Sequence, residues 1–222
     1  LASVKGIEWV RLLYTFPAHI TDDLITVIAR ESRVCKYIDV PLQHISDRIL
    51  TTMGRRFSAI KTKQLLRHIR ASIPDVALRT TFIVGFPGET EKEFEELLDF
   101  VRETRFEKLG AFIYSREEGT QAYHLPRQIP RDTARKRLDR LMQAQQEISA
   151  EIQRQRVGRT IKVLIDARDK TEDNIYWGRS EYDAPEVDGR VAVRSPRRLR
   201  PGDLVPVRIT SAQDYDLEGR LA

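Results

Sequence analysis

Polar and glycine residues stand at the ends of three short apolar segments of this chain. Gln43 and His44 follow one segment, Gly85 to Gly88 follow the next, and Tyr114 and Ser115 follow a third. Glycine lets a ligand approach backbone N–H groups closely, and a helix N-terminus behind it favours an anionic group. Such residues can bind a small polar cofactor or move a proton. They also make ordinary turns, so both interpretations stay open.

His44 and Cys35 carry further chemistry of their own. His44 could act as a base or a metal ligand, but none of the four histidines stands three or four positions from another, so we expect no metal site. Cys35 could be a reactive thiol, although a single cysteine beside a basic residue is more often structural. One cysteine excludes an internal disulfide and any metal or iron–sulfur site built from cysteines alone.

The elements that must position these strand ends alternate between strand and helix. We expect strands over 7–14, 37–41, 76–84 and 108–114, with helices between them. Because successive strands begin about 30 to 40 residues apart, the connections are crossovers and the strands form a parallel sheet or partial barrel. Ligands then bind at the carboxyl ends of the strands.

The character of the sequence changes after residue 115. A loop rich in Gly, Pro and Gln precedes a long amphipathic helix, and five short β-rich runs then alternate with turn sequences. Such runs are typical of a small antiparallel barrel of about 65 residues. We therefore predict an α/β partial parallel barrel over 1–130, a connecting helix over 131–156 and a small antiparallel β-barrel over 157–222.

Composition and charge narrow the classes of function. The 222 residues are 41% apolar and 32% charged, which excludes disordered, collagen-like and coiled-coil classes. No apolar run approaches the roughly 20 residues that span a bilayer, so we expect a cytoplasmic monomer with no membrane role. The net charge of +5 lies entirely in residues 1–156, because residues 157–222 hold 12 basic and 12 acidic residues. This balance favours an anionic partner only weakly.

Three long motifs resemble the radical S-adenosylmethionine methylthiotransferases. They are KYIDVPLQHISDRILTTMGR at 36–55, RTTFIVGFPGETEKEFEELLDF at 79–100 and FIYSREEGTQAYHLPRQIP at 112–130. Residues 157–222 resemble the TRAM domain of that family. PLQHISDRIL at 41–50 and GRSEYDAPEVDGRV at 178–191 are similar to the RimO-type members, which methylthiolate the β-carbon of an aspartate in the twelfth protein of the small ribosomal subunit. The MiaB-type members, which modify tRNA adenosine, usually read closer to PVQSGSDRVL.

The resemblance implies a binding site for S-adenosylmethionine at the strand ends. Polar groups after one strand would hold its ribose or methionyl part, a glycine-containing strand would pack beside adenine and ribose, and the last strand would contact adenine through its backbone. The candidate residues are Gln43, Ser46, Arg55, Arg79, Thr81, Gly85, Phe112, Ile113 and Tyr114. Arg55 and Arg79 are candidates for the cofactor carboxylate, because a guanidinium binds a carboxylate through two parallel hydrogen bonds.

The sequence departs from the family in its cysteines. Members hold a catalytic four-iron, four-sulfur cluster through a CxxxCxxC motif and a second cluster through three further cysteines, and none of these six is present here. The segment 7–14 resembles the third barrel strand of the family. We therefore expect the C-terminal half of such an enzyme, which supplies four βα units and part of the cofactor wall but no iron ligand and no catalytic residue.

The substrate can be judged from charge. Asp183, Glu186 and Asp188 make one loop of the small barrel acidic, together with Glu181, and such a loop suits a basic ribosomal protein. Asp183 and Asp188 could instead cap turns around Pro185 and Gly189.

Other functions remain open beside this one. A barrel that grips tRNA should carry clustered Lys and Arg, and this one is neutral. The alternatives are a tRNA adenosine methylthiotransferase and a non-catalytic module that binds RNA, the ribosome or a protein. A generic aldolase or lyase lacks the strand-end lysine it would need.

The single cysteine leads to the first prediction. Anaerobic treatment of the 222-residue chain with iron and sulfide should give no absorbance of a cubane cluster and no 5′-deoxyadenosine, because one thiolate cannot hold four irons. A stoichiometric cluster on the purified chain would contradict this expectation.

Overall fold

The computed structural model describes all 222 residues. In it the chain folds into two compact units. One unit contains Leu12–Ser32 and Ile38–Gln145, and the other contains Leu1–Arg11, Arg33–Tyr37 and Gln146–Ala222. None of the helices combines the length and the apolar character that a membrane span requires.

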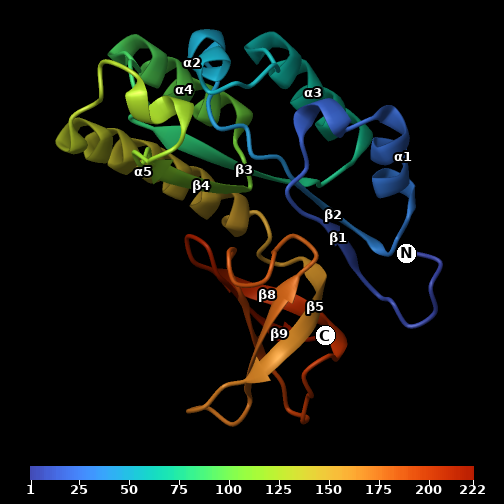
Figure 1. The fold of residues 1–222 in the computed structure, drawn as a ribbon. Coiled ribbons are helices and arrows are strands. Elements are labelled where there is room, and N and C mark those ends of the chain that lie inside the picture. The colour runs from blue at the N-terminus through green and yellow to red at the C-terminus, as the bar shows by residue number, and fades with distance from the viewer. The chain divides into compact units, whose positions relative to one another are not determined.

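Strands and helices alternate through the first half of the chain (Figure 1). They are β1 (Val10–Leu12), a 3₁₀ turn (Pro17–His19), α1 (Asp22–Arg30), β2 (Val34–Asp39), α2 (Asp47–Thr52), α3 (Ala59–Ser72), β3 (Ala77–Val84), α4 (Glu91–Thr104) and β4 (Lys108–Ile113). The sheet has the order β1-β2-β3-β4. The predicted alternation is confirmed, although β1 is shorter than the apolar segment around it and β2 begins three residues before the predicted strand.

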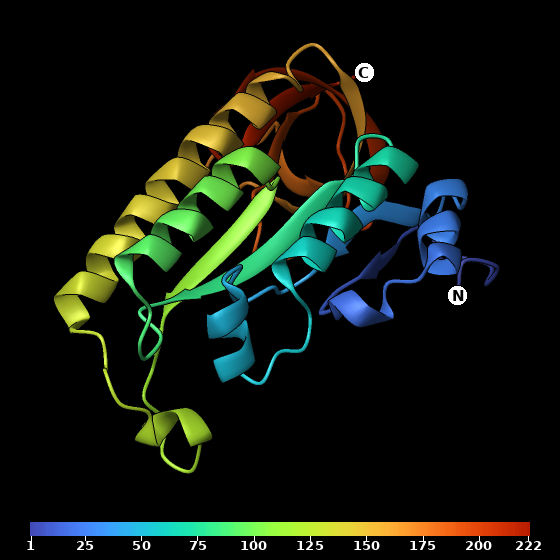
Figure 2. The ribbon, with the colours of Figure 1, turned by 90° about the horizontal axis from the view of Figure 1, so that it is seen from above.

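The two faces of β3 differ in burial. Leu78, Thr80, Phe82 and Val84 are buried, and the ring of Phe82 meets that of Phe100 in α4 edge to face at 6.3 Å between centroids. On the other face Ala77 is buried, but Arg79, Thr81 and Ile83 are only half-buried. Since successive side chains of a strand point to opposite faces, one face of the sheet packs under helices (Figure 2) and the other is open to a ligand.

Sequence signals at the start of α4 explain where it begins. Thr90 and Glu93 form a capping box, in which each side chain bonds the backbone N–H of the other residue. The long helix α5 (Arg131–Arg154) follows a 3₁₀ turn at Gln121–His124 and runs beside α4 (Figure 2). Arg140 of α5 bonds the carboxylates of Glu91 and Glu95 on α4, so charge pairs join the two helices.

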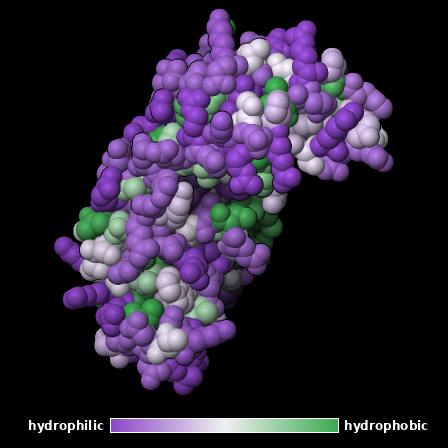
Figure 3. Space-filling view, turned by 90° about the vertical axis from the view of Figure 1, so that its left-hand side faces the viewer, coloured by the Kyte–Doolittle hydropathy of each residue, from purple (hydrophilic) through white to green (hydrophobic).

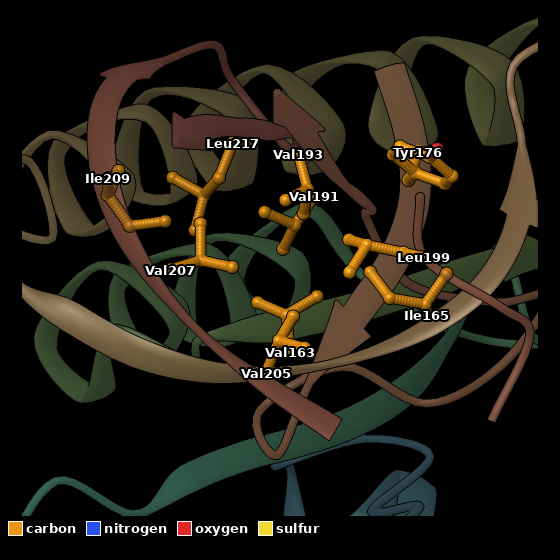
Figure 4. Close-up of a cluster of buried hydrophobic side chains, with 10 residues drawn as sticks. All are labelled: Val163, Ile165, Tyr176, Val191, Val193, Leu199, Val205, Val207, Ile209 and Leu217. Atoms are coloured by element: carbon orange, nitrogen blue, oxygen red, sulfur yellow. The ribbon is translucent and has the colours of Figure 1, made fainter. Parts of the chain in front are cut away.

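The last strands close into a small barrel. They are β5 (Thr160–Arg168), β6 (Ile175–Ser180), β7 (Val191–Arg194), β8 (Leu204–Ala212) and β9 (Leu217–Leu221), in the order β5-β6-β7-β9-β8. All five predicted strands are present, and every described pair is antiparallel except β7 with β9, which is parallel. The side chains in Figure 4, among them Val163, Val207 and Leu217, converge inside this ring and form its core.

Hydrophilic side chains cover most of the face in Figure 3, and hydrophobic side chains appear there in small separate groups. Scattered apolar residues of this kind are normal on a folded protein.

Candidate cofactor site

A cavity of about 720 Å³ lies at the carboxyl ends of β3 and β4, next to the segment that follows β2. Its volume falls within the range of small-molecule sites, roughly 300–1,000 Å³. It is lined by Gln43, Thr52, Met53, Arg55, Thr81, Ile83, Phe86, Phe112, Ile113, Tyr114, Ser115, Thr120, Gln121 and Ala122. Six of the nine predicted cofactor residues are thus brought together: Gln43, Arg55, Thr81, Phe112, Ile113 and Tyr114.

The register of β3 and β4 explains how these side chains meet. Thr81 lies opposite Gly110, and Ile83 lies opposite Phe112, so the open face carries a polar layer and then an apolar layer toward the strand ends. Phe112 is 62% exposed, which is unusual for a phenylalanine in a sheet and leaves its ring available for stacking.

Several polar groups in the cavity wall lack a partner within the chain. The hydroxyl of Tyr114 is buried and makes no hydrogen bond, while its ring packs edge-on against Phe86 at 5.2 Å. The amide of Gln43 and the hydroxyl of Thr81 make no hydrogen bond with the rest of the chain either. Because buried polar groups are normally paired, the Tyr114 hydroxyl favours a polar ligand in the cavity, and the half-buried amide of Gln43 and hydroxyl of Thr81 are available to the same ligand.

The backbone of Gln43 is strained. Its φ of 71° lies in the left-handed region, which costs a residue other than glycine about 1–3 kcal/mol. Its N–H donates to the carbonyl of Thr81 at 2.9 Å, and its carbonyl accepts from the N–H of Ile83 at 2.8 Å, as a parallel bridge to Phe82. The surrounding structure therefore holds Gln43 in this conformation against its own preference.

A buried network lies directly behind Gln43. The Nδ1 atom of His44 accepts from the backbone N–H of Ser46 at 2.9 Å, which leaves the ring proton on Nε2 to donate to Glu89 at 3.1 Å. The other carboxylate oxygen of Glu89 accepts from the N–H of Gly85 at 2.6 Å and from Arg137 of α5 at 2.7 Å. The side chains of His44, Glu89 and Arg137 are almost completely buried. His44 is thus engaged inside the fold and bears on the cavity only through its neighbours.

The carboxylate of Glu93, nearer the surface, also connects the segment after β2 with the segment after β3. Glu93 accepts from the hydroxyl of Ser46 at 2.8 Å and from Arg48 at 2.6 Å and 2.8 Å. Partial burial raises the pKa of Glu93, but the hydrogen bonds from Arg48 and Thr90 outweigh it and lower the pKa to about 2. Arg48 also donates to the carbonyl of Gly88. The segments 43–48 and 85–93 therefore behave as one unit.

Glu89, Glu93 and Arg137 shape the site, although no motif in the sequence assigned them to it. A signal for Arg137 was available, because it stands three residues after Ala134 and four before Leu141, on the apolar stripe of the helix. A charged residue on a buried stripe predicts a buried partner of opposite charge.

Three of the predicted cofactor residues lie outside the cavity lining. The hydroxyl of Ser46 is used twice, since it donates to Glu93 and caps α2 by accepting from the N–H of Ile49. Arg79 pairs with the buried carboxylate of Asp39 at 2.9 Å.

Gly85 is the third of these residues, and its surroundings explain why it is glycine. Its φ is 72°, and a Cβ at this position would lie 2.5 Å from the Cβ of Ala134 in α5. The position therefore serves a tight turn and the close approach of a helix, and the cofactor role predicted for Gly85 stays a prediction.

The acidic loop of the small barrel is bonded within its own unit. Asp183 is buried, and its carboxylate accepts from the hydroxyl and the N–H of Ser180. Asp188 accepts from the hydroxyl of Tyr37 and the N–H of Ala184, both at 2.7 Å. Only Glu186 is exposed among the three predicted substrate residues. These contacts favour the turn-capping alternative for Asp183 and Asp188.

Cys35 is buried, and burial is the main cause that raises the pKa of its thiol. A raised pKa keeps the thiol protonated and unreactive. Nowhere in the described chain do three or more His, Cys, Asp or Glu residues gather as a metal site would require.

Comparison with protein families agrees with this architecture. Residues 5–101 match the radical SAM superfamily and residues 157–222 match the TRAM domain. The chain therefore combines part of a radical S-adenosylmethionine fold with a TRAM domain. The division of the chain near residue 157 stays a prediction.

Curated relatives narrow the family further. "Ribosomal protein uS12 methylthiotransferase RimO" of Pelotomaculum thermopropionicum is 48% identical over 219 residues, which are 99% of this chain and 49% of that protein. The proteins of the same name from Desulforudis audaxviator and Parabacteroides distasonis are 47% and 44% identical, and the match covers 100% of this chain and 48% and 51% of those proteins. Along its whole length the chain is similar to these uS12 methylthiotransferases, and it spans about half of their length.

A solved structure of the radical S-adenosylmethionine methyltransferase TsrM from Kitasatospora setae is a more distant match. It is 18% identical, has a TM-score of 0.41, and the match covers 67% of this chain and 24% of that chain. This likeness is too low to bear on individual residues of the site.

The packing of Gly85 gives a prediction about stability. Gly85→Ala should lower the free energy of unfolding by about 2 kcal/mol or more, because the added methyl overlaps Ala134 and the left-handed backbone disfavours alanine. The double variant with Ala134→Gly should recover at least about 1 kcal/mol of that loss, measured by urea unfolding. If the losses of unfolding free energy in Gly85→Ala and Ala134→Gly simply add in the double variant, or if Gly85→Ala is as stable as the original chain, Gly85 and Ala134 are not in close contact.

Proposed function

We propose that this chain forms the S-adenosylmethionine wall of an enzyme that methylthiolates the β-carbon of an aspartate in ribosomal protein uS12. The observation that carries the proposal is the cavity at the carboxyl ends of the parallel strands, in which polar groups of Gln43, Thr81 and Tyr114 lack protein partners. Relatives named for this activity match the chain over its whole length.

The lining suits the cofactor chemically. Adenine is flat and apolar on its faces, and the exposed ring of Phe112 with Ile83 offers a surface on which it can stack. Ribose hydroxyls need groups that both donate and accept, as the amide of Gln43 and the hydroxyl of Thr81 do. Arg55 lies on the cavity rim over the ring of Phe16, where its guanidinium can bind a carboxylate.

The iron–sulfur clusters of such an enzyme find no ligands in this chain. Cys35 is the only cysteine and it is buried. We propose that the two clusters are held by other residues of the full-length enzyme. When bound, the clusters and S-adenosylmethionine supply the radical chemistry and the sulfur, and the residues described here bind, orient and shield.

What this chain contributes is therefore placement. Phe86 and Phe112 line the cavity with apolar surface, which limits water beside the reacting group. Gln43 and Thr81 fix the orientation of the cofactor through hydrogen bonds, and the stiffness of the parallel strands maintains that orientation.

A basic ribosomal protein is the proposed partner, in the cytoplasm, where ribosomes are made. The neutral charge of residues 157–222 supports a protein substrate over tRNA, because a tRNA-binding barrel gains affinity from clustered cations. Binding to the ribosome itself, and action as a monomer, belong to the same proposal.

Removal of the Thr81 hydroxyl tests the cofactor site. In the full-length enzyme that contains this sequence, Thr81→Val should weaken S-adenosylmethionine binding about tenfold, because it removes one hydrogen bond and adds an apolar group. The melting temperature should stay almost constant, since the hydroxyl has no partner in the chain. Equilibrium dialysis measures binding, and mass spectrometry of uS12 measures methylthiolation.

The matched control is Thr51→Val, which alters an exposed threonine of α2 outside the cavity lining. It should leave binding unchanged. Equal effects of the two variants would contradict the proposed site, and methylthiolated tRNA with unmodified uS12 would replace the proposed substrate by tRNA.

A further inference from the structure

Gln43 stands apart from the other strained residues of the chain. The non-glycine residues with positive φ are Tyr14, Gln43, Asp75, Arg105, Arg127 and Glu186. Of these, only Gln43 lines the cavity. A residue held in a sparsely populated conformation persists only where its surroundings enforce it, and such residues gather at ligand sites.

The enforcing contacts come from both sides of Gln43. Toward the sheet, its backbone N–H and carbonyl are bonded to β3. Toward α2, the next residue, His44, is fixed by Glu89, whose second oxygen bonds the N–H of Gly85 and the guanidinium of Arg137. Glu89 therefore connects the segment that presents Gln43 to the end of β3 and to α5.

We infer that Glu89 is a positioning residue that acts through His44 to hold the strained backbone of Gln43 and aim its amide into the cavity. This inference rests on the proposed cofactor site, because it is there that the amide would bind S-adenosylmethionine. Glu89 itself does not line the cavity, although its backbone N–H donates to the carbonyl of Phe86, which does.

Two features of the structure disfavour a merely structural role. A well-packed apolar replacement for a buried ion pair is often as stable as the pair, so stability alone does not require Glu89 and Arg137. Glycine would relieve the left-handed backbone at position 43, so stability alone does not require glutamine there either. The buried pair of Glu89 and Arg137 and the glutamine at position 43 have one explanation in common: the network maintains the position of the Gln43 amide.

The first variant removes the side-chain amide of Gln43 while the fold is expected to stay intact. In the full-length enzyme, Gln43→Gly should leave the melting temperature unchanged or raise it by a few degrees, and should weaken S-adenosylmethionine binding about tenfold. The control Arg105→Gly changes a residue of similar φ, 54°, at the end of α4 and outside the cavity lining, and should leave binding unchanged. Unchanged binding in Gln43→Gly would overturn the inference.

The second measurement tests whether Glu89 acts through Gln43. Glu89→Gln should also weaken binding about tenfold, because an amide has one accepting oxygen and cannot accept both from His44 and from Gly85 and Arg137, as the two carboxylate oxygens do. In the double variant with Gln43→Gly the two losses should not multiply, since the group that Glu89 positions is already absent. If Glu89→Gln does not fold, His44→Leu replaces it in the same cycle.

The outcomes separate this inference from the proposed function. Losses that multiply in the double variant, while Thr81→Val weakens binding, would overturn the positioning role and leave the cofactor site intact. Unchanged binding in Thr81→Val as well as in Gln43→Gly would overturn the cofactor site and the inference with it.

Discussion

The buried carboxylate of Glu89 is the constraint on which the site depends. It is desolvated, so it must be paired, and its partners come from three separate parts of the chain: His44 after β2, the backbone of Gly85 after β3, and Arg137 in α5. Removal of one partner would leave a charge buried without compensation, which typically costs about 3–5 kcal/mol. The network thereby fixes the ends of the neighbouring strands β2 and β3 relative to α5.

The cavity is a consequence of this arrangement. Because the strand ends are held from behind, their open face can keep polar groups without partners and a phenylalanine in solvent, neither of which a sheet would otherwise favour. The strain at Gln43 belongs to the same arrangement. A binding site requires rigid support and polar groups that still lack hydrogen-bond partners, whereas a stable core does not require the latter.

Much of this could be predicted from the sequence. Periodicity and turn signals predicted the parallel sheet and the five barrel strands, because these depend on local preferences and on burial of one face. Motif resemblance predicted six residues of the cavity lining. Ser46, Arg79 and Gly85 lie outside this lining. Their surroundings depend on partners distant in the sequence, Glu93, Asp39 and Ala134, which a local motif does not reveal.

The most direct test of the account is a crystal structure of the full-length enzyme with S-adenosylmethionine bound. We expect the adenosyl group between Thr81, Ile83 and Phe112, the Gln43 amide in contact with the cofactor, and Glu89 still bonded to His44 and Arg137. A cofactor bound away from this cavity, or a Gln43 amide turned away from it, would contradict the account.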